Sequence, residues 1–168
     1  MNFNCINNDI NNGISTITIK NIVADYNTED IVFDETYSNI EEIKWTYNRK
    51  CRFIDSIIHK YASFPIVAEK FDMNKLRIID GKQRIETLVE FVGDLFELNS
   101  LSTDVSYTIK DKNGLPMKCK EKIIGKTYTQ LSDFLQRNIL RYCFPMILIY
   151  NYSDKDKLKQ RYLLNENL

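Results

Sequence analysis

Five consecutive residues, Asp80, Gly81, Lys82, Gln83 and Arg84, combine the side chains that phosphate chemistry needs. Glycine lets the backbone turn sharply and come close to a ligand. Lysine and arginine supply two positive charges, and a guanidinium group can contact two phosphate oxygens at once. The glutamine could orient a water molecule, and the aspartate could hold a metal ion or accept a proton. These residue types predict a phosphate-binding site.

The elements on either side decide how this stretch is presented. Residues 76–79 have the pattern of a short strand, and the apolar positions from Ile85 to Phe96 follow helical spacing. The free backbone N–H groups and the dipole of a helix start favour an anion. Two cations at that end oppose the dipole and therefore need a partner, for which a phosphate would serve. In the alternative, the stretch is a surface turn in which Arg84 pairs with Asp80 or Glu86.

Other segments predict the rest of a mixed domain. Strands are expected at residues 14–19, 31–33, 65–68 and 144–150, and helices at residues 50–61, 129–142 and from 153 to about 164. The helix over 50–61 carries Phe53, Ile54, Ile57, Ile58 and Tyr61 at helical spacing, and we expect this apolar face to pack on the sheet. Residues 106–126 form a polar excursion with a turn at 112–114. Helices and strands alternate, which indicates a mixed fold class.

Length and composition limit the class of protein. The chain of 168 residues fits one domain, expected over residues 14–168 after a flexible N-terminus at 1–13. No apolar run approaches the roughly 18 residues of a membrane-spanning helix, and the first residues do not resemble a secretory signal. The four cysteines are widely spaced and there is one histidine, which argues against structural zinc. Free thiols suit a reducing compartment, and we expect a cytoplasmic protein.

Charge is unevenly distributed, although the chain as a whole is neutral. Residues 1–48 carry two basic and eight acidic side chains, a net of −6, and residues 49–168 carry twenty-one basic and fifteen acidic, a net of +6. The basic part either binds a polyanion or neutralises the acidic part within the fold. Residues 106–126 hold six lysines against two acids. Within this stretch Lys118, Lys120 and Lys122 are candidates for nucleic-acid phosphate contacts, and a solvated loop is the alternative.

A family resemblance rests on four segments in the same order. Residues 79–88 resemble the signature "viDGqQRltTl" of a large bacterial family that includes the N-terminal domain of GmrSD-type, modification-dependent restriction enzymes. Trp45 with residues 52–58, residues 64–67 and residues 162–165 resemble three further segments of that family. The resemblance covers roughly residues 14–168.

This resemblance implies an α+β fold like that of ParB and sulfiredoxin, a small mixed sheet with flanking helices. Proteins of that fold bind nucleotide phosphates with a Gly-x-x-Arg turn at a helix start, as in Gly81 to Arg84. The implied cofactors are a nucleoside triphosphate and Mg²⁺. The implied catalytic residues are Asp80, Gln83 and Arg84, the implied nucleotide-binding residues are Gly81, Lys82, Gln83 and Arg84, and Asp80 is the implied metal ligand. The expected partners are the nucleotide, then DNA or a nuclease or defence protein, with a homodimer as a further option and no membrane.

Two departures from the family leave two functions open. The family often has a Gln-Arg pair ahead of the tryptophan, and residues 33–45 lack it. An HNH nuclease centre needs several histidines, and His59, expected on a helix surface, is the one histidine of the chain. We therefore expect a short stand-alone or truncated member without its own nuclease. It is either a nucleotide-binding, NTP-hydrolysing module of a bacterial or phage restriction or defence system, or a non-catalytic phage or mobile-element protein that modulates a host defence or DNA-processing complex.

Overall fold

The computed structural model describes residues 13–33, 44–72 and 74–150. The expected flexible segment, apart from Gly13, lies outside the described residues. The same holds for the helix expected from residue 153 and for the match at residues 162–165. Residues 34–43, which cover most of the stretch that lacks the Gln-Arg pair, are also outside them.

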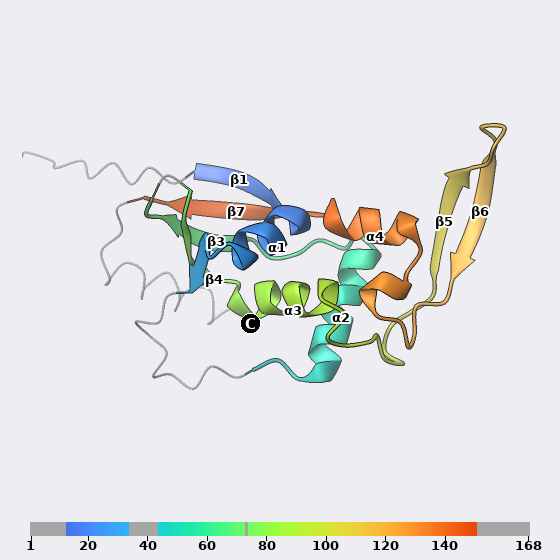
Figure 1. Ribbon diagram of the computed structural model, residues 1–168, viewed down its shortest axis with the longest axis horizontal. Coiled ribbons are helices and arrows are strands. Elements are labelled where there is room, and N and C mark those ends of the chain that lie inside the picture. Colours follow the sequence, from blue (N-terminus) through green and yellow to red (C-terminus); the bar gives the residue numbers. More distant parts are fainter. Residues whose placement is uncertain (1–12, 34–43, 73, 151–168) are drawn as a thin grey trace, which may run out of the picture.

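A mixed five-stranded sheet forms the centre of the described structure (Figure 1). Its strands in spatial order are β1 (Gly13–Thr18), β7 (Cys143–Ile149), β3 (Ile66–Lys70), β4 (Leu76–Asp80) and β2 (Ile31–Phe33). The pairs β1–β7 and β3–β4 are antiparallel, whereas β7–β3 and β4–β2 are parallel. The middle strand β3 begins with a run of buried apolar residues, as expected for a strand covered on both faces.

The described part of the chain also contains four α-helices and a 3-10 turn. They are α1 (Ile19–Asn27), α2 (Tyr47–Ile58), α3 (Lys82–Val92), η2 (Tyr128–Gln130) and α4 (Asp133–Leu140). The hydroxyl groups of Thr18, Thr46 and Ser132 cap α1, α2 and α4 by accepting backbone N–H groups, the usual way to satisfy the first turn of a helix. Thus three of these helix starts are fixed by local sequence.

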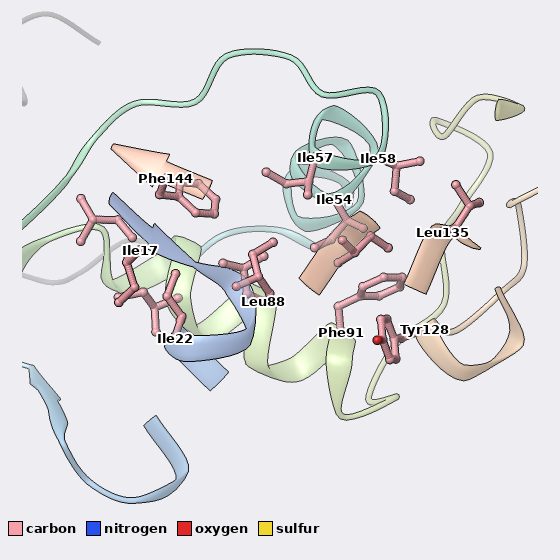
Figure 2. Close-up of a cluster of buried hydrophobic side chains, with 14 of the residues drawn as sticks. Ile17, Ile22, Ile54, Ile57, Ile58, Leu88, Phe91, Tyr128, Leu135 and Phe144 are labelled. Carbon is pink, nitrogen blue, oxygen red and sulfur yellow. The ribbon is translucent and has the colours of Figure 1, made fainter. Parts of the chain in front are cut away.

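The main core lies between one face of the sheet and the four helices. Its residues from the five-stranded sheet are Ile17, Ile31, Ile66, Ala68, Ile78, Phe144 and Met146, and they meet buried residues of all four helices. Figure 2 shows Ile54, Ile57 and Ile58 of α2 beside Phe91 and Leu88 of α3. The predicted apolar face of α2 is therefore buried. Tyr61 is an exception, since the helix ends at Ile58 and the tyrosine residue is 61% exposed.

The opposite face of the sheet carries a second, smaller buried cluster. Val67, Ile79 and Ile149 are buried there, and Ile147 packs against them. Helices together with a mixed sheet confirm the α+β class. None of the helices in the described ranges has the length and apolar character required to cross a membrane.

The polar excursion expected at residues 106–126 is mostly a two-stranded ribbon. Its strands β5 (Val105–Lys110) and β6 (Pro116–Glu121) pair with each other in antiparallel register and form a sheet of their own. Figure 1 shows this ribbon standing away from the five-stranded sheet, beyond α4. Two other elements differ from the prediction. Helix α1 was not predicted, and the single helix predicted over 129–142 is instead the 3-10 turn η2 followed by α4.

Candidate functional site

The 80–84 turn, meaning residues 80–84, joins the end of β4 to the start of α3. Gly81 precedes the helix with φ = 112°, a backbone angle that side chains with a Cβ rarely adopt. A Cβ atom at this position would lie 3.3 Å from Cγ1 of Ile66 on β3 and 3.4 Å from Nη2 of Arg84. The glycine is thus required both by its backbone angle and by the packing around it.

Arg84 is buried in this turn and has two partners within the chain. Its Nη2 donates to Oδ2 of Asp80 at 2.5 Å, and its Nη1 donates to the carbonyl oxygen of Phe64 at 2.6 Å. The arginine side chain is 10% exposed and the aspartate side chain 31%. Burial lowers the pKa of Arg84, and the nearby carboxylate of Asp80 opposes that shift. The ion pair considered as the alternative from sequence is therefore present, although in a buried setting.

Gln83 connects the turn to the segment before α2. Its side-chain Oε1 accepts the backbone N–H of Trp45 at 3.0 Å. The indole ring packs edge-on against Phe53 at 5.2 Å, and the guanidinium of Arg49 lies 4.7 Å from its centroid. Trp45 is half-buried and acts as an anchor between α2 and the start of α3.

Lys82, the first residue of α3, contacts the end of β2. Its Nζ lies 5.5 Å from the ring centroid of Phe33, within the range of a cation–π interaction. Three sequence-distant residues, Phe33, Trp45 and Phe64, thus each contact a different side chain of the 80–84 turn. Trp45 and residues 64–67 belong to the segments of the family resemblance, but the sequence predicted no contact of these segments, or of Phe33, with the turn.

The electrostatics at the start of α3 favour an anion. The first turn of the helix contains no acidic residue, and Gly81 provides no side-chain cap. Backbone N–H groups at a helix start attract negative charge, and Lys82, the first residue of the helix, adds a positive charge to this end. The start of α3 is therefore suited to hold a phosphate group against Gly81. The contacts of Arg84 with Asp80 and Phe64 fix the position of this turn.

Metal ligands are sparse in the described structure. No group of three or more His, Cys, Asp or Glu side chains suited to a metal ion occurs within residues 13–33, 44–72 and 74–150. Magnesium, however, is usually held by one or two carboxylates together with substrate phosphates and water. The carboxylate of Asp80 is a group of the type that Mg²⁺ would use in such a site, and its Oδ2 already accepts a hydrogen bond from Arg84.

His59 belongs to a polar cluster at the C-terminal end of α2. Its Nδ1 lies 2.9 Å from the carbonyl oxygen of Asp55, and its Nε2 lies 3.2 Å from Oγ1 of Thr103. Oδ1 of Asp55 accepts the backbone N–H of Thr103 at 2.8 Å. This cluster fastens α2 to the chain just before the ribbon, so the histidine is half-buried rather than on a free surface.

The three lysines predicted to contact nucleic acid lie at the ribbon. Lys118 and Lys120 are on β6, opposite Thr108 and Ser106 of β5, and Lys122 directly follows the strand. All three lysines are exposed. The ribbon and the start of α3 lie toward opposite ends of the molecule (Figure 1). The structure therefore does not bring these lysines together with the 80–84 turn.

Fold and site together define a small α+β domain with a strand–glycine–helix turn at its candidate site. The family model of the N-terminal domain of the GmrSD restriction endonuclease matches residues 41–167, which is most of the chain and includes the 80–84 turn. The protein belongs to this family, which associates it with restriction and defence systems. No curated protein and no solved structure matches the chain.

Proposed function

We propose that the chain is a nucleoside-triphosphate-binding module of a bacterial or phage restriction system and that it hydrolyses the nucleotide. The observation that carries the proposal is the start of α3, where a glycine turn without a side-chain cap lies beside Lys82 and is fixed by the buried Arg84. Such a helix start binds phosphate through backbone N–H groups and the helix dipole. Family membership supports a role in restriction.

Each residue of the turn has a distinct part in this proposal. Gly81 lets the phosphates approach the backbone, and Lys82 supplies the charge that contacts them. Arg84 fixes the turn through Phe64 and Asp80 and adds positive charge close to the phosphates. The Mg²⁺ ion, when bound, neutralises phosphate charge.

For hydrolysis, Asp80 holds the metal ion or accepts a proton, and Gln83 orients the attacking water. The Arg84 charge stabilises the negative charge of the transferred phosphoryl group. Because Oε1 of Gln83 already accepts the N–H of Trp45, the amide group of this side chain is held at a fixed position. That fixed position suits a residue that orients a water molecule.

A second candidate is a non-catalytic protein that modulates a host defence or DNA-processing complex. The observation in its favour is that Asp80, Gln83 and Arg84 all have hydrogen-bond partners within the chain. Such contacts position a turn without any need for catalysis. The second candidate predicts that a nucleotide either does not bind or binds without being hydrolysed.

The test is a thermal-shift and calorimetric titration with ATP, GTP, CTP and UTP, each with and without Mg²⁺, followed by measurement of phosphate release. A ligand at a hundred times its Kd should add about 2.7 kcal/mol to stability. We expect Lys82→Gln to weaken nucleotide binding about tenfold, the size of one charge-assisted contact. Lys20→Gln on the exposed side of α1 is the matched control and should bind as the natural chain does. Absence of binding at millimolar nucleotide with Mg²⁺ would rule out the proposal, and binding without phosphate release would favour the second candidate.

A further inference from the structure

The ribbon presents one face with a regular pattern of lysine and hydroxyl side chains. Side chains alternate between the two faces of a strand, and cross-strand partners share a face. The register pairs Ser106 with Lys120, Thr108 with Lys118 and Lys110 with Pro116. These six residues therefore form one face, named here the lysine face, and all six are exposed.

The lysine face is cationic. It contains three lysines, two hydroxyl groups and no acidic residue. Nζ of Lys120 lies 3.1 Å from Oδ2 of Asp104, with the two side chains 69% and 36% exposed. An ion pair that is so open to water is weak, and its lysine exchanges readily to another anion. The positive charge of this face is therefore available to a partner.

The other face attaches the ribbon to the body of the protein. The ring of Tyr107 stacks on Phe134 of α4 with centroids 4.4 Å apart, and its hydroxyl lies 3.2 Å from Oε2 of Glu121 and from Oγ of Ser132. Oε1 of Glu121 in turn accepts the backbone N–H of Ser132 at 3.0 Å and pairs with Lys126 at 2.9 Å. These contacts fix the base of the ribbon and so determine the direction in which the lysine face points.

We propose that the lysine face binds duplex DNA. The major groove is about 12 Å wide and admits a two-stranded ribbon, whose strands lie about 4.8 Å apart. Lysines two positions apart on a strand are separated by about 6.8 Å, and each DNA strand carries a phosphate about every 3.4 Å along the helix axis. Because each DNA strand also winds around the axis, neighbouring phosphates lie farther apart in space than this axial rise, and Lys118 and Lys120 can contact neighbouring phosphates. Serine and threonine hydroxyls are common donors to phosphate oxygens and sugars.

This DNA site is separate from the proposed nucleotide site. The ribbon lies toward the opposite end of the molecule from the start of α3 (Figure 1). A nucleotide at the 80–84 turn and a duplex at the ribbon would therefore not compete for the same residues. DNA binding can be tested without any nucleotide, so the failure of one proposal leaves the other standing.

The test is fluorescence anisotropy of the full chain with a labelled mixed-sequence duplex of about 20 base pairs, across roughly 50–200 mM salt. The variant carries Lys110→Gln, Lys118→Gln and Lys120→Gln. The matched control removes the same charge elsewhere on the surface, with Lys20→Gln, Lys70→Gln and Lys75→Gln. Circular dichroism and melting confirm that both variants are folded.

We expect the lysine-face variant to bind at least tenfold more weakly than the control. The slope of log K against log salt should fall by about 0.9 for each lost phosphate contact, or about 2.7 for three. The proposal is overturned by any of four results: no binding by the natural chain at the lowest salt, an equal loss in the control, tighter binding of single-stranded DNA of the same length, or equal binding of polyglutamate of the same charge.

Discussion

The 80–84 turn and the lysine face of the ribbon are both cationic, yet their charges lie in different settings. In the turn, Arg84 is buried and has two partners within the chain. On the ribbon, the lysines are exposed, and the ion pair of Lys120 with Asp104 is open to water. The comparison shows that a basic residue in a candidate phosphate site can be part of the fold itself, whereas one on a ribbon is free to act on a partner. Substitutions should accordingly affect stability in the turn and binding on the ribbon.

The two regions also differ in how they are assembled. The turn depends on contacts with three segments that lie far away in the sequence, at Phe33, Trp45 and Phe64. The lysine face depends on the pairing of two neighbouring strands. Damage to the packing of the domain should therefore disturb the turn before it disturbs the pattern of the ribbon.

The largest effect is expected for Arg84→Ala, measured without any ligand. It removes the partner of Asp80 and leaves the carbonyl of Phe64 without this donor, so we expect a loss of about 2–4 kcal/mol in the free energy of unfolding. Arg84→Lys should recover only part, because an ammonium group cannot reach both partners with the same geometry. Urea denaturation measures the free energy of unfolding of the natural chain and of both variants.

The control for this experiment is Arg52→Ala on the exposed side of α2, which should change stability by less than about 0.5 kcal/mol. If both alanine variants lose the same stability, the burial of Arg84 has no special role. The claim that substitutions in the turn act through stability would then be wrong.

The next effect concerns Gly81→Ala. The alanine backbone would have to adopt a φ of 112°, and its Cβ would lie 3.3 Å from Cγ1 of Ile66. Backbone strain and the close contact therefore both destabilise the variant. We expect a loss of about 1–3 kcal/mol. Gly114→Ala is the matched control, since its φ is 80° with nothing within 4 Å, and it isolates the backbone strain. Thermal melting of both variants should show the larger loss at Gly81, and equal losses would mean that the packing against Ile66 is loose.

Glu121→Gln tests the base of the ribbon. Burial alone would raise the pKa of Glu121, but hydrogen bonds from Ser132 and Lys126 hold it below its usual range. A carboxylate with a lowered folded-state pKa stabilises the fold above the ordinary glutamate value of about 4.3, and this contribution is lost as the pH falls through the lowered pKa. We expect Glu121→Gln to cost about 1–2 kcal/mol at neutral pH and to remove that part of the acid dependence.

The measurement for this prediction is urea denaturation at a series of pH values from neutral to about pH 3. Glu97→Gln is the control, because its side chain is exposed and should show a negligible change at neutral pH. An acid dependence in Glu121→Gln that is unchanged from the natural chain would show that another carboxylate is responsible for it.

Much of the fold follows from local patterns in the sequence. Helical spacing of apolar residues predicted the buried face of α2, and short apolar runs predicted β3, β4 and β7. These predictions succeeded because the period of the pattern is set by the element itself. The glycine between a strand and a helical pattern likewise located the 80–84 turn.

The missed elements had weaker or competing signals. Ile19, Ile22, Val23 and Tyr26 follow helical spacing in α1, but the preceding run of β-branched residues extends into Ile19 and favoured a strand. In the ribbon, Val105, Tyr107 and Ile109 alternate with polar residues, which is a strand pattern. Because the segment is rich in lysine, it was predicted as a polar excursion without strands.

The contacts of the candidate site could not be predicted from sequence. Arg84 binds a carbonyl 20 residues away and Gln83 binds an N–H 38 residues away, and spacing carries no information about such pairs. The sequence showed which residue types could bind phosphate. Whether each would be buried or exposed depends on tertiary packing.

The smallest effect is expected for the lysines of the ribbon. Lys118→Gln and Lys120→Gln remove charge from side chains that are exposed, and surface substitutions of this kind usually change stability by less than about 0.5 kcal/mol. Lys120 has one ion pair, with Asp104, so a double-mutant cycle of Lys120→Gln and Asp104→Asn measures its coupling energy directly. We expect a coupling below about 1 kcal/mol that falls further with added salt, because water and ions screen an exposed pair. A coupling above that value, or one insensitive to salt, would mean that Lys120 stabilises the ribbon. The lysine would then resemble Arg84, and the difference between the two regions would be one of degree.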